Sequence, residues 1–189
     1  FENYDLWQHI LLSGVIILLV VVNFFGAELA IRAENGFNVG KLVLLAIFIV
    51  VGLSMPMEWG RLAPADYVAP GALICGAMVI FLNYEGFELI ANAAHELDRP
   101  KRTVPIAYLG GVAMVMVVYI LIATVTVGHM DFAEIASHSD YALSVAAEKM
   151  MGKAGFVMIG VAALLATSSA INATFYGSGK MMYVIARSG

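Results

Sequence analysis

Polar and ionisable residues gather at positions 83–88, inside an otherwise apolar stretch that reads GALICGAMVIFLNYEGFELIANAAHEL. They are Asn83, Tyr84, Glu85, Gly86 and Glu88. Glycine weakens a helix interior, so Gly86 among polar neighbours predicts an interrupted helix. If the stretch crosses a membrane, the backbone groups freed by such a break must line a cavity or bind a ligand. Secondary transporters bind their substrates at breaks of this kind.

The alternative is a continuous helix whose acidic side chains extend to the membrane surface. Glu88 lies eight residues before Glu96, which is about 12 Å along a helix. That depth exceeds what a glutamate side chain easily spans. We therefore favour a discontinuous helix over about residues 69–94.

A second group of candidates consists of Lys41 and a run of hydroxyls. Lys41 opens the apolar run KLVLLAIFIVVGLSM, where it either extends to the membrane surface or forms a buried ammonium. Because burial disfavours the charged form of an amine, a buried Lys41 could release its proton and replace a coupling cation. The run ATSSAINAT includes Ser168, Ser169 and Thr174. These hydroxyls either join helices together or line a polar path.

Composition places these residues in a membrane protein. Of 189 residues, 61% are hydrophobic and 13% charged, against about 45–50% and 25% in soluble domains. Intrinsic disorder is excluded because the chain is rich in apolar residues, and a disulfide scaffold because Cys75 is the only cysteine. The net charge of −4 gives no basic surface for nucleic acid.

No catalytic or metal-binding pattern stands out in the sequence. The four histidines are scattered without metal-ligand spacing. The HExxH and GxSxG motifs of membrane proteases and esterases are absent from it. We therefore expect no cofactor, no metal and no enzymatic activity.

The apolar runs predict an all-α integral membrane fold, since a helix needs about 20 mostly apolar residues to cross the bilayer. A long outer loop over 128–154 is expected to hold two short amphipathic helices, near Asp131–Ile135 and Tyr141–Met151. They would cover either an outer vestibule or merely the membrane interface. The five expected spans cover about 10–31, 37–57, 69–94, 104–127 and 156–183.

Basic residues set the expected orientation. The connections after the first, third and fifth spans hold seven of the ten Lys and Arg residues. Because basic loops stay in the cytoplasm, loop 95–103 should be cytoplasmic and Phe1 outside. We expect a multi-pass protein of the plasma membrane. The start at Phe1 and the stop after a long apolar stretch suggest a single-domain fragment, 1–189, of a longer chain.

Three stretches carry a resemblance to a known family. FLNYEGFELIANAAHELDRPKRTVPIA, residues 81–107, resembles the sixth-helix signature of amino-acid permeases of the amino acid–polyamine–organocation (APC) superfamily. LLATSSAINATFYGSGKMMYVIARSG resembles their eighth helix, and NFFGAELAIRAENGFNVGKLVLL their fourth and fifth helices. The resemblance implies helices four to eight of a transporter built from two inverted five-helix repeats.

The resemblance also implies a substrate site. The unwound segment would be Leu82–Glu85, whose backbone carbonyls would receive the substrate amino group. Gly86 belongs to the break, and Tyr84 and Phe87 would lie near the bound substrate. Glu85 departs from the small or neutral residue of many relatives, which could mark cation or proton handling.

For ion coupling, Lys41 is similar in context to a helix-five lysine that replaces sodium in sodium-independent members. It would face helix-eight hydroxyls, for which Ser168, Ser169 and Thr174 are candidates. Lys41 or Glu88 would then carry the proton.

These features predict secondary active transport of an amino acid or related amine by alternating access, as proton symport or exchange. The expected partners are the small-molecule substrate and the lipid bilayer; the sequence predicts no oligomeric state. The alternative is a non-transporting membrane subunit or receptor whose polar residues serve helix packing. An ion channel would need a continuous hydrated pore lined by polar groups. Lys41 opposite a single pair of acidic residues argues against such a pore.

Overall fold

The computed structural model describes residues 4–24, 27–63, 68–84, 86 and 99–188. Nearly all of these residues are helical, and none of them forms a β-strand. Three of the described helical segments are long and apolar enough to cross a membrane: Glu28–Ser54, Pro100–His129 and Lys153–Arg187. Shorter apolar helices cover His9–Phe24 and Pro70–Tyr84. The expectation of an all-α integral membrane fold is confirmed.

The first two predicted spans divide differently in the structure. The sequence predicts one span over 10–31, then a polar connection and a second span over 37–57. Instead, α1 (Tyr4–Phe24) ends within the first predicted span. The next helix, α2 (Ala27–Ser54), runs through the whole predicted connection.

Side-chain pairs one helical turn apart explain why that connection is helical. Arg32 pairs with Glu28 at 2.7 Å, and Asn38 Nδ2 donates a hydrogen bond to Glu34 Oε1 at 2.9 Å. Each such i,i+4 pair stabilises a helix by about 0.2–0.5 kcal/mol, and α2 contains no proline. The polar composition that resembles a loop is therefore the polar part of a continuous helix.

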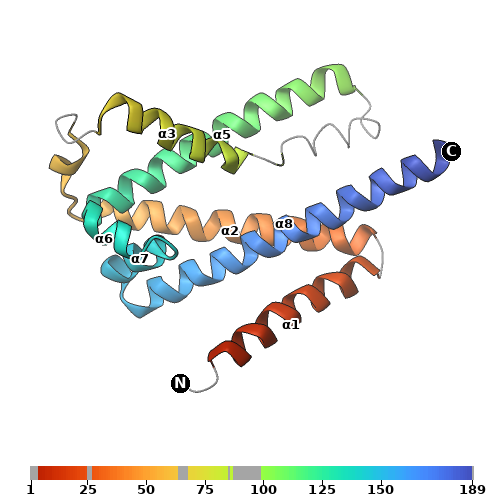
Figure 1. The fold of residues 1–189 in the computed structure, drawn as a ribbon, viewed down its shortest axis with the longest axis horizontal. Helices are drawn as coiled ribbons and strands as arrows, with labels where there is room; N and C mark the ends of the chain where they lie inside the picture. The colour runs from red at the N-terminus through yellow and green to blue at the C-terminus, as the bar shows by residue number, and fades with distance from the viewer. Residues whose placement is uncertain (1–3, 25–26, 64–67, 85, 87–98, 189) are drawn as a thin grey trace. The chain divides into compact units, whose positions relative to one another are not determined.

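The chain divides into two compact units, and the expectation of one membrane domain stays a prediction. The first unit holds residues 1–45 and 158–189, which are α1, the first part of α2 and most of α8 (Lys153–Ser188) (Figure 1). Leu19 and Ala30 are buried in it. At Gly40 an added Cβ would lie 3.0 Å from Leu165 Cδ1, so α2 and α8 approach closely there.

The second unit holds residues 46–157. Its core includes the fully buried side chains of Phe48, Val125, Met130, Ala146 and Ala147. Besides the end of α2 and the start of α8, its elements are η1 (Trp59–Leu62), α3 (Pro70–Phe81), η3 (Leu82–Tyr84), α5 (Pro100–His129), α6 (Phe132–Ser137) and α7 (Ala142–Met151).

The fourth predicted span starts earlier than expected. The sequence predicts 104–127 with Pro105 near its first turn, but α5 begins at Pro100. Proline suits the first helical position because the N–H it lacks there has no partner within the helix. Pro105 therefore lies inside α5. In the fifth span the expected range 156–183 lies entirely within α8.

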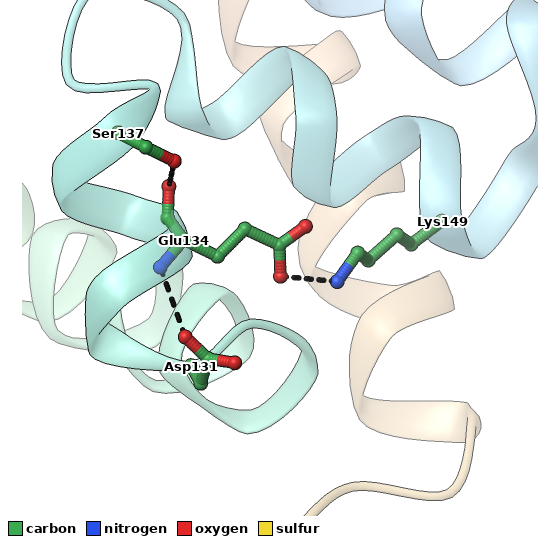
Figure 2. Close-up of polar contacts among 4 residues, drawn as sticks. All are labelled: Asp131, Glu134, Ser137 and Lys149. Atoms are coloured by element: carbon green, nitrogen blue, oxygen red, sulfur yellow. Dashed lines mark hydrogen bonds and ion pairs between the residues drawn. The ribbon is translucent and has the colours of Figure 1, made fainter.

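The two short helices expected over residues 128–154 are confirmed as α6 and α7, and an ion pair joins them (Figure 2). Asp131 caps α6, because its Oδ1 accepts a hydrogen bond of 2.9 Å from the backbone N–H of Glu134. The carboxylate of Glu134 forms an ion pair with Lys149 of α7. Ser137 donates to the backbone carbonyl of Glu134. Glu134 thus joins the start of α6 to the end of α7.

Replacing Asp131 with alanine is expected to destabilise α6 by about 1 kcal/mol, the usual cost of losing an N-cap side chain. Amide hydrogen exchange over residues 132–137 should quicken about fivefold, which is the equivalent of that energy. Asp131→Asn is the matched control, because asparagine caps about as well as aspartate. Equal exchange rates in the alanine variant and the wild type would contradict the capping role.

Candidate functional site

The break predicted in the third span begins where α3 ends. The α-helix stops at Phe81, and Leu82–Tyr84 continues as a 3₁₀ turn. Gly86 has a φ of 97°, a left-handed conformation that glycine adopts without steric cost. The Tyr84 ring packs edge-on against Tyr119 of α5, with ring centroids 5.8 Å apart. The α-helix therefore ends beside the residue types that predict a break, and residues 87–94 of the predicted span lie outside the described residues.

The side chains of the predicted substrate site differ in their surroundings. Leu82 is 66% exposed and Asn83 is exposed, whereas Tyr84 is partly buried. Glu85 and Phe87 lie outside the described residues. Glu88, one of the two predicted proton carriers, lies outside them as well.

Lys41, the other predicted proton carrier, contacts one of its predicted partners in the first unit. Its Nζ donates a hydrogen bond to Ser169 Oγ at 3.3 Å, and Ser169 is only 4% exposed. Thr174 instead donates to the carbonyl of Ala170 in its own helix, at 2.9 Å. Ser168 is partly buried. Of the three candidate hydroxyls, Ser169 is the one that the structure brings to Lys41.

Lys41 and Ser169 belong to a hydrogen-bonded cluster, and Glu34 is its next member. Ser169 Oγ donates to Glu34 Oε1 at 2.5 Å and also lies 3.3 Å from Asn38 Oδ1. Asn38 Nδ2 donates to the same Glu34 oxygen at 2.9 Å. Glu34, Asn38 and Lys41 have i, i+4, i+7 spacing, so they share one face of α2. Ser169 on α8 thus connects a carboxylate to an ammonium.

Two asparagines complete the cluster on the other carboxylate oxygen. Asn172 Nδ2 lies 3.1 Å from Glu34 Oε2 and 3.2 Å from the carbonyl of Ala30. Asn172 is 2% exposed, and its Oδ1 accepts a 2.7 Å hydrogen bond from Asn23 Nδ2 of α1. Asn23 also donates to the carbonyl of Leu19. All three helices of the first unit therefore contribute to holding Glu34.

The two charged side chains of the cluster, Lys41 and Glu34, form hydrogen bonds to neutral side chains and not to each other. Among the residues that the structure describes, the ion pairs are Arg32 with Glu28 and Lys149 with Glu134, so neither Lys41 nor Glu34 takes part in one. A hydrogen bond to a charged group contributes about 1.5–3 kcal/mol, roughly twice that of a neutral bond. Such bonds can hold the cluster together while leaving Lys41 free of a direct carboxylate partner.

Glu34, Asn38 and Asn23 are absent from the sequence-based set of site residues, and Asn172 is there only a member of the polar run in the fifth span. The sequence predicts that Glu34 and Asn38 belong to a connection between spans, where polar residues are common and attract no functional interpretation. The i, i+4, i+7 spacing that ends at Lys41 is the signal that could have revealed them.

Comparison with known proteins finds relatives of this chain. The chain is 35% identical to the uncharacterized protein MJ0609 of Methanocaldococcus jannaschii, over 93% of this chain and 40% of that protein. It is 28% identical to the inner membrane transport protein YbaT of Escherichia coli, over 89% of this chain and 40% of YbaT. It is 23% identical to the methylthioribose transporter of Bacillus subtilis, over 93% of this chain and 37% of that protein.

The chain thus spans about two-fifths of the length of these curated relatives. The last two are named as transporters and not as enzymes. A family model described as "Amino acid permease" matches residues 2–189. The chain therefore belongs to the amino acid permease family.

Proposed function

We propose that the protein containing this chain carries amino acids or related amines across the plasma membrane by alternating access, as a proton symporter or an exchanger. Membership of the amino acid permease family supports the substrate class. A related transporter is named for methylthioribose, so the substrate panel of any test must extend beyond amino acids. Loop 95–103 would lie in the cytoplasm and Phe1 outside, as the distribution of basic residues favours.

The single observation that carries the coupling proposal is the hydrogen bond between Lys41 and Ser169. An ionisable group in a membrane helix is costly and is usually kept for function. An ammonium that donates to a neutral hydroxyl can give up its proton without breaking an ion pair. Lys41 would thus bind α2 to α8 more strongly when it is protonated, which is the role of a coupling cation.

The substrate would bind where α3 ends. The 3₁₀ turn Leu82–Tyr84 and Gly86 provide backbone groups outside a regular α-helix, and carbonyls at such a break suit the ammonium of an amino acid. Residues 82–87 remain the proposed contacts. Glu88 remains the alternative to Lys41 as the proton carrier.

The test uses the full-length parent protein, purified and reconstituted into liposomes. Uptake of labelled amino acids, polyamines and methylthioribose is measured with and without an inward proton gradient, with empty liposomes and a protonophore as controls. We expect the gradient to raise the uptake of at least one amino acid. Uptake that requires internal substrate and ignores the gradient would identify the exchange mode. No uptake of any panel member would overturn the proposal and favour the subunit or receptor alternative.

A further inference from the structure

We propose that Glu34 is the proton acceptor for Lys41, reached through the hydroxyl of Ser169. This inference rests on the proposed proton coupling and deepens it, because it names the route by which the proton leaves. The three groups form a continuous chain of hydrogen bonds from Lys41 Nζ to Ser169 Oγ, at 3.3 Å, and onward to Glu34 Oε1, at 2.5 Å.

The transfer is balanced in atoms and charge. The ammonium of Lys41 gives a proton to Ser169 Oγ, while the hydroxyl proton of Ser169 passes to Glu34 Oε1. The products are a neutral amine, an intact hydroxyl and a neutral carboxylic acid. Because a charged pair becomes a neutral pair, the transfer also removes two charges from a partly buried site.

The surroundings of Glu34 suit an acceptor whose position must not vary. Asn38 donates to Oε1 and Asn172 to Oε2, so both carboxylate oxygens are oriented. Asn172 is itself fixed by Asn23 and by the carbonyl of Ala30. The two amide side chains that contact the carboxylate, those of Asn38 and Asn172, carry no charge and do not compete for the proton.

The order of the residues along α2 gives the transfer a direction. Glu34 lies seven residues before Lys41, about 10 Å nearer the start of α2. That end of α2 is the one that the distribution of basic residues places toward the cytoplasm. The proton would therefore move inward, in the direction in which a proton symporter releases it.

Other charged or titratable groups near Glu34 are few among the described residues of the first unit. On α2, Arg32 is paired with Glu28, and both side chains are largely exposed. On α8, Tyr176 lies one turn beyond Asn172. On α1, the contact to the cluster is the neutral amide of Asn23. Lys41 is accordingly the cation of α2 that the hydrogen bonds connect to Glu34.

The test compares Glu34→Gln with Glu28→Gln in the full-length parent in proteoliposomes. Glutamine keeps the shape and most hydrogen bonds of Glu34 but accepts no proton. We expect Glu34→Gln to lower gradient-driven uptake about tenfold or more, the equivalent of losing one charged hydrogen bond. Exchange of labelled for unlabelled substrate, which requires no net proton release, should persist. Glu28→Gln alters an exposed carboxylate on the same helix and should change neither rate.

Two further variants separate the relay from structural support. Ser169→Ala removes the intervening hydroxyl and should reproduce the Glu34→Gln result, whereas Ser169→Thr keeps a hydroxyl and should retain gradient-driven uptake. Glu34→Asp should restore part of it. If Glu34→Gln does not fold, the comparison of Ser169→Ala with Ser169→Thr tests the relay by itself.

The outcomes distinguish this inference from the proposed function. Gradient-driven uptake that survives in both Glu34→Gln and Ser169→Ala, but is lost when Lys41 is replaced, would overturn the relay and leave the proposed function intact. Wild-type uptake that ignores the gradient would overturn the proton coupling itself and the relay with it.

Discussion

Uptake driven by a proton gradient is expected to fall about tenfold or more when Lys41 is replaced by alanine. The reason lies in its hydrogen bond to Ser169 across α2 and α8. A proton can shift a conformational equilibrium only by the difference in its interaction energy between the two states. A charged donor contributes about 1.5–3 kcal/mol and a neutral one about 0.5–1.5 kcal/mol. A difference of about 1.4 kcal/mol, which these ranges allow, corresponds to a factor of ten.

Lys41→Arg distinguishes the proton from the positive charge. Arginine keeps the charge and a donor for Ser169 but does not release its proton. We expect it to lose the gradient response as alanine does, while protein yield and thermal stability remain near wild type. The measurement is the initial rate of labelled substrate uptake into proteoliposomes with and without the gradient.

The control for these variants is Lys101→Ala, because Lys101 is exposed at the start of α5. Its uptake should keep the wild-type gradient response. Undiminished gradient-driven uptake in Lys41→Ala would show that Lys41 only extends toward the membrane surface, and Glu88 would become the candidate proton carrier.

The largest expected loss of stability comes from replacing Gly155 with alanine. A Cβ at this position would lie 2.3 Å from the carbonyl oxygen of Ala147 and 2.8 Å from its carbon. These are backbone atoms of α7 in a fully buried residue, so no side-chain rotation relieves the overlap. Overpacking of this kind costs about 1–3 kcal/mol. The midpoint of thermal unfolding of the full-length parent in detergent should fall by several degrees.

Gly160→Ala is the matched control for this substitution. Gly160 lies in the same helix, and an added Cβ there meets nothing within 4 Å. Alanine is favoured over glycine in a helix interior by about 1 kcal/mol, so this variant should unfold at the wild-type temperature or above it. A Gly155→Ala protein as stable as Gly160→Ala would show that α7 and α8 do not pack as closely as the structure indicates.

Local sequence patterns predict most of the helices correctly, because each pattern acts within its own segment. Apolar runs longer than the bilayer thickness yield α5 and α8, and amphipathic spacing yields α6 and α7. The polar residues and glycine near position 84 predict the end of α3. In each case the preference for a helix, or for its end, comes from residues within a short stretch of chain.

The same reasoning misplaces the boundary between the first two spans. Arg32, Glu34 and Asn38 resemble a solvated connection because polar residues are common there. Inside α2 they form pairs one turn apart, and Glu34 gains further partners from α8. Composition by itself does not distinguish a polar loop from the polar face of a helix that packs on a neighbour.

The sequence by itself determines the membrane class, the helical fold and Lys41 as a candidate for coupling, since these depend on composition, run length and the cost of charge in lipid. Only the tertiary structure decides which groups Lys41 meets. Ser169 lies 128 residues from Lys41 and 135 residues from Glu34 along the chain. The close packing of α2 on α8 brings these atoms within hydrogen-bonding distance, and the spacing of residues within one helix does not show which residue of the other helix they contact.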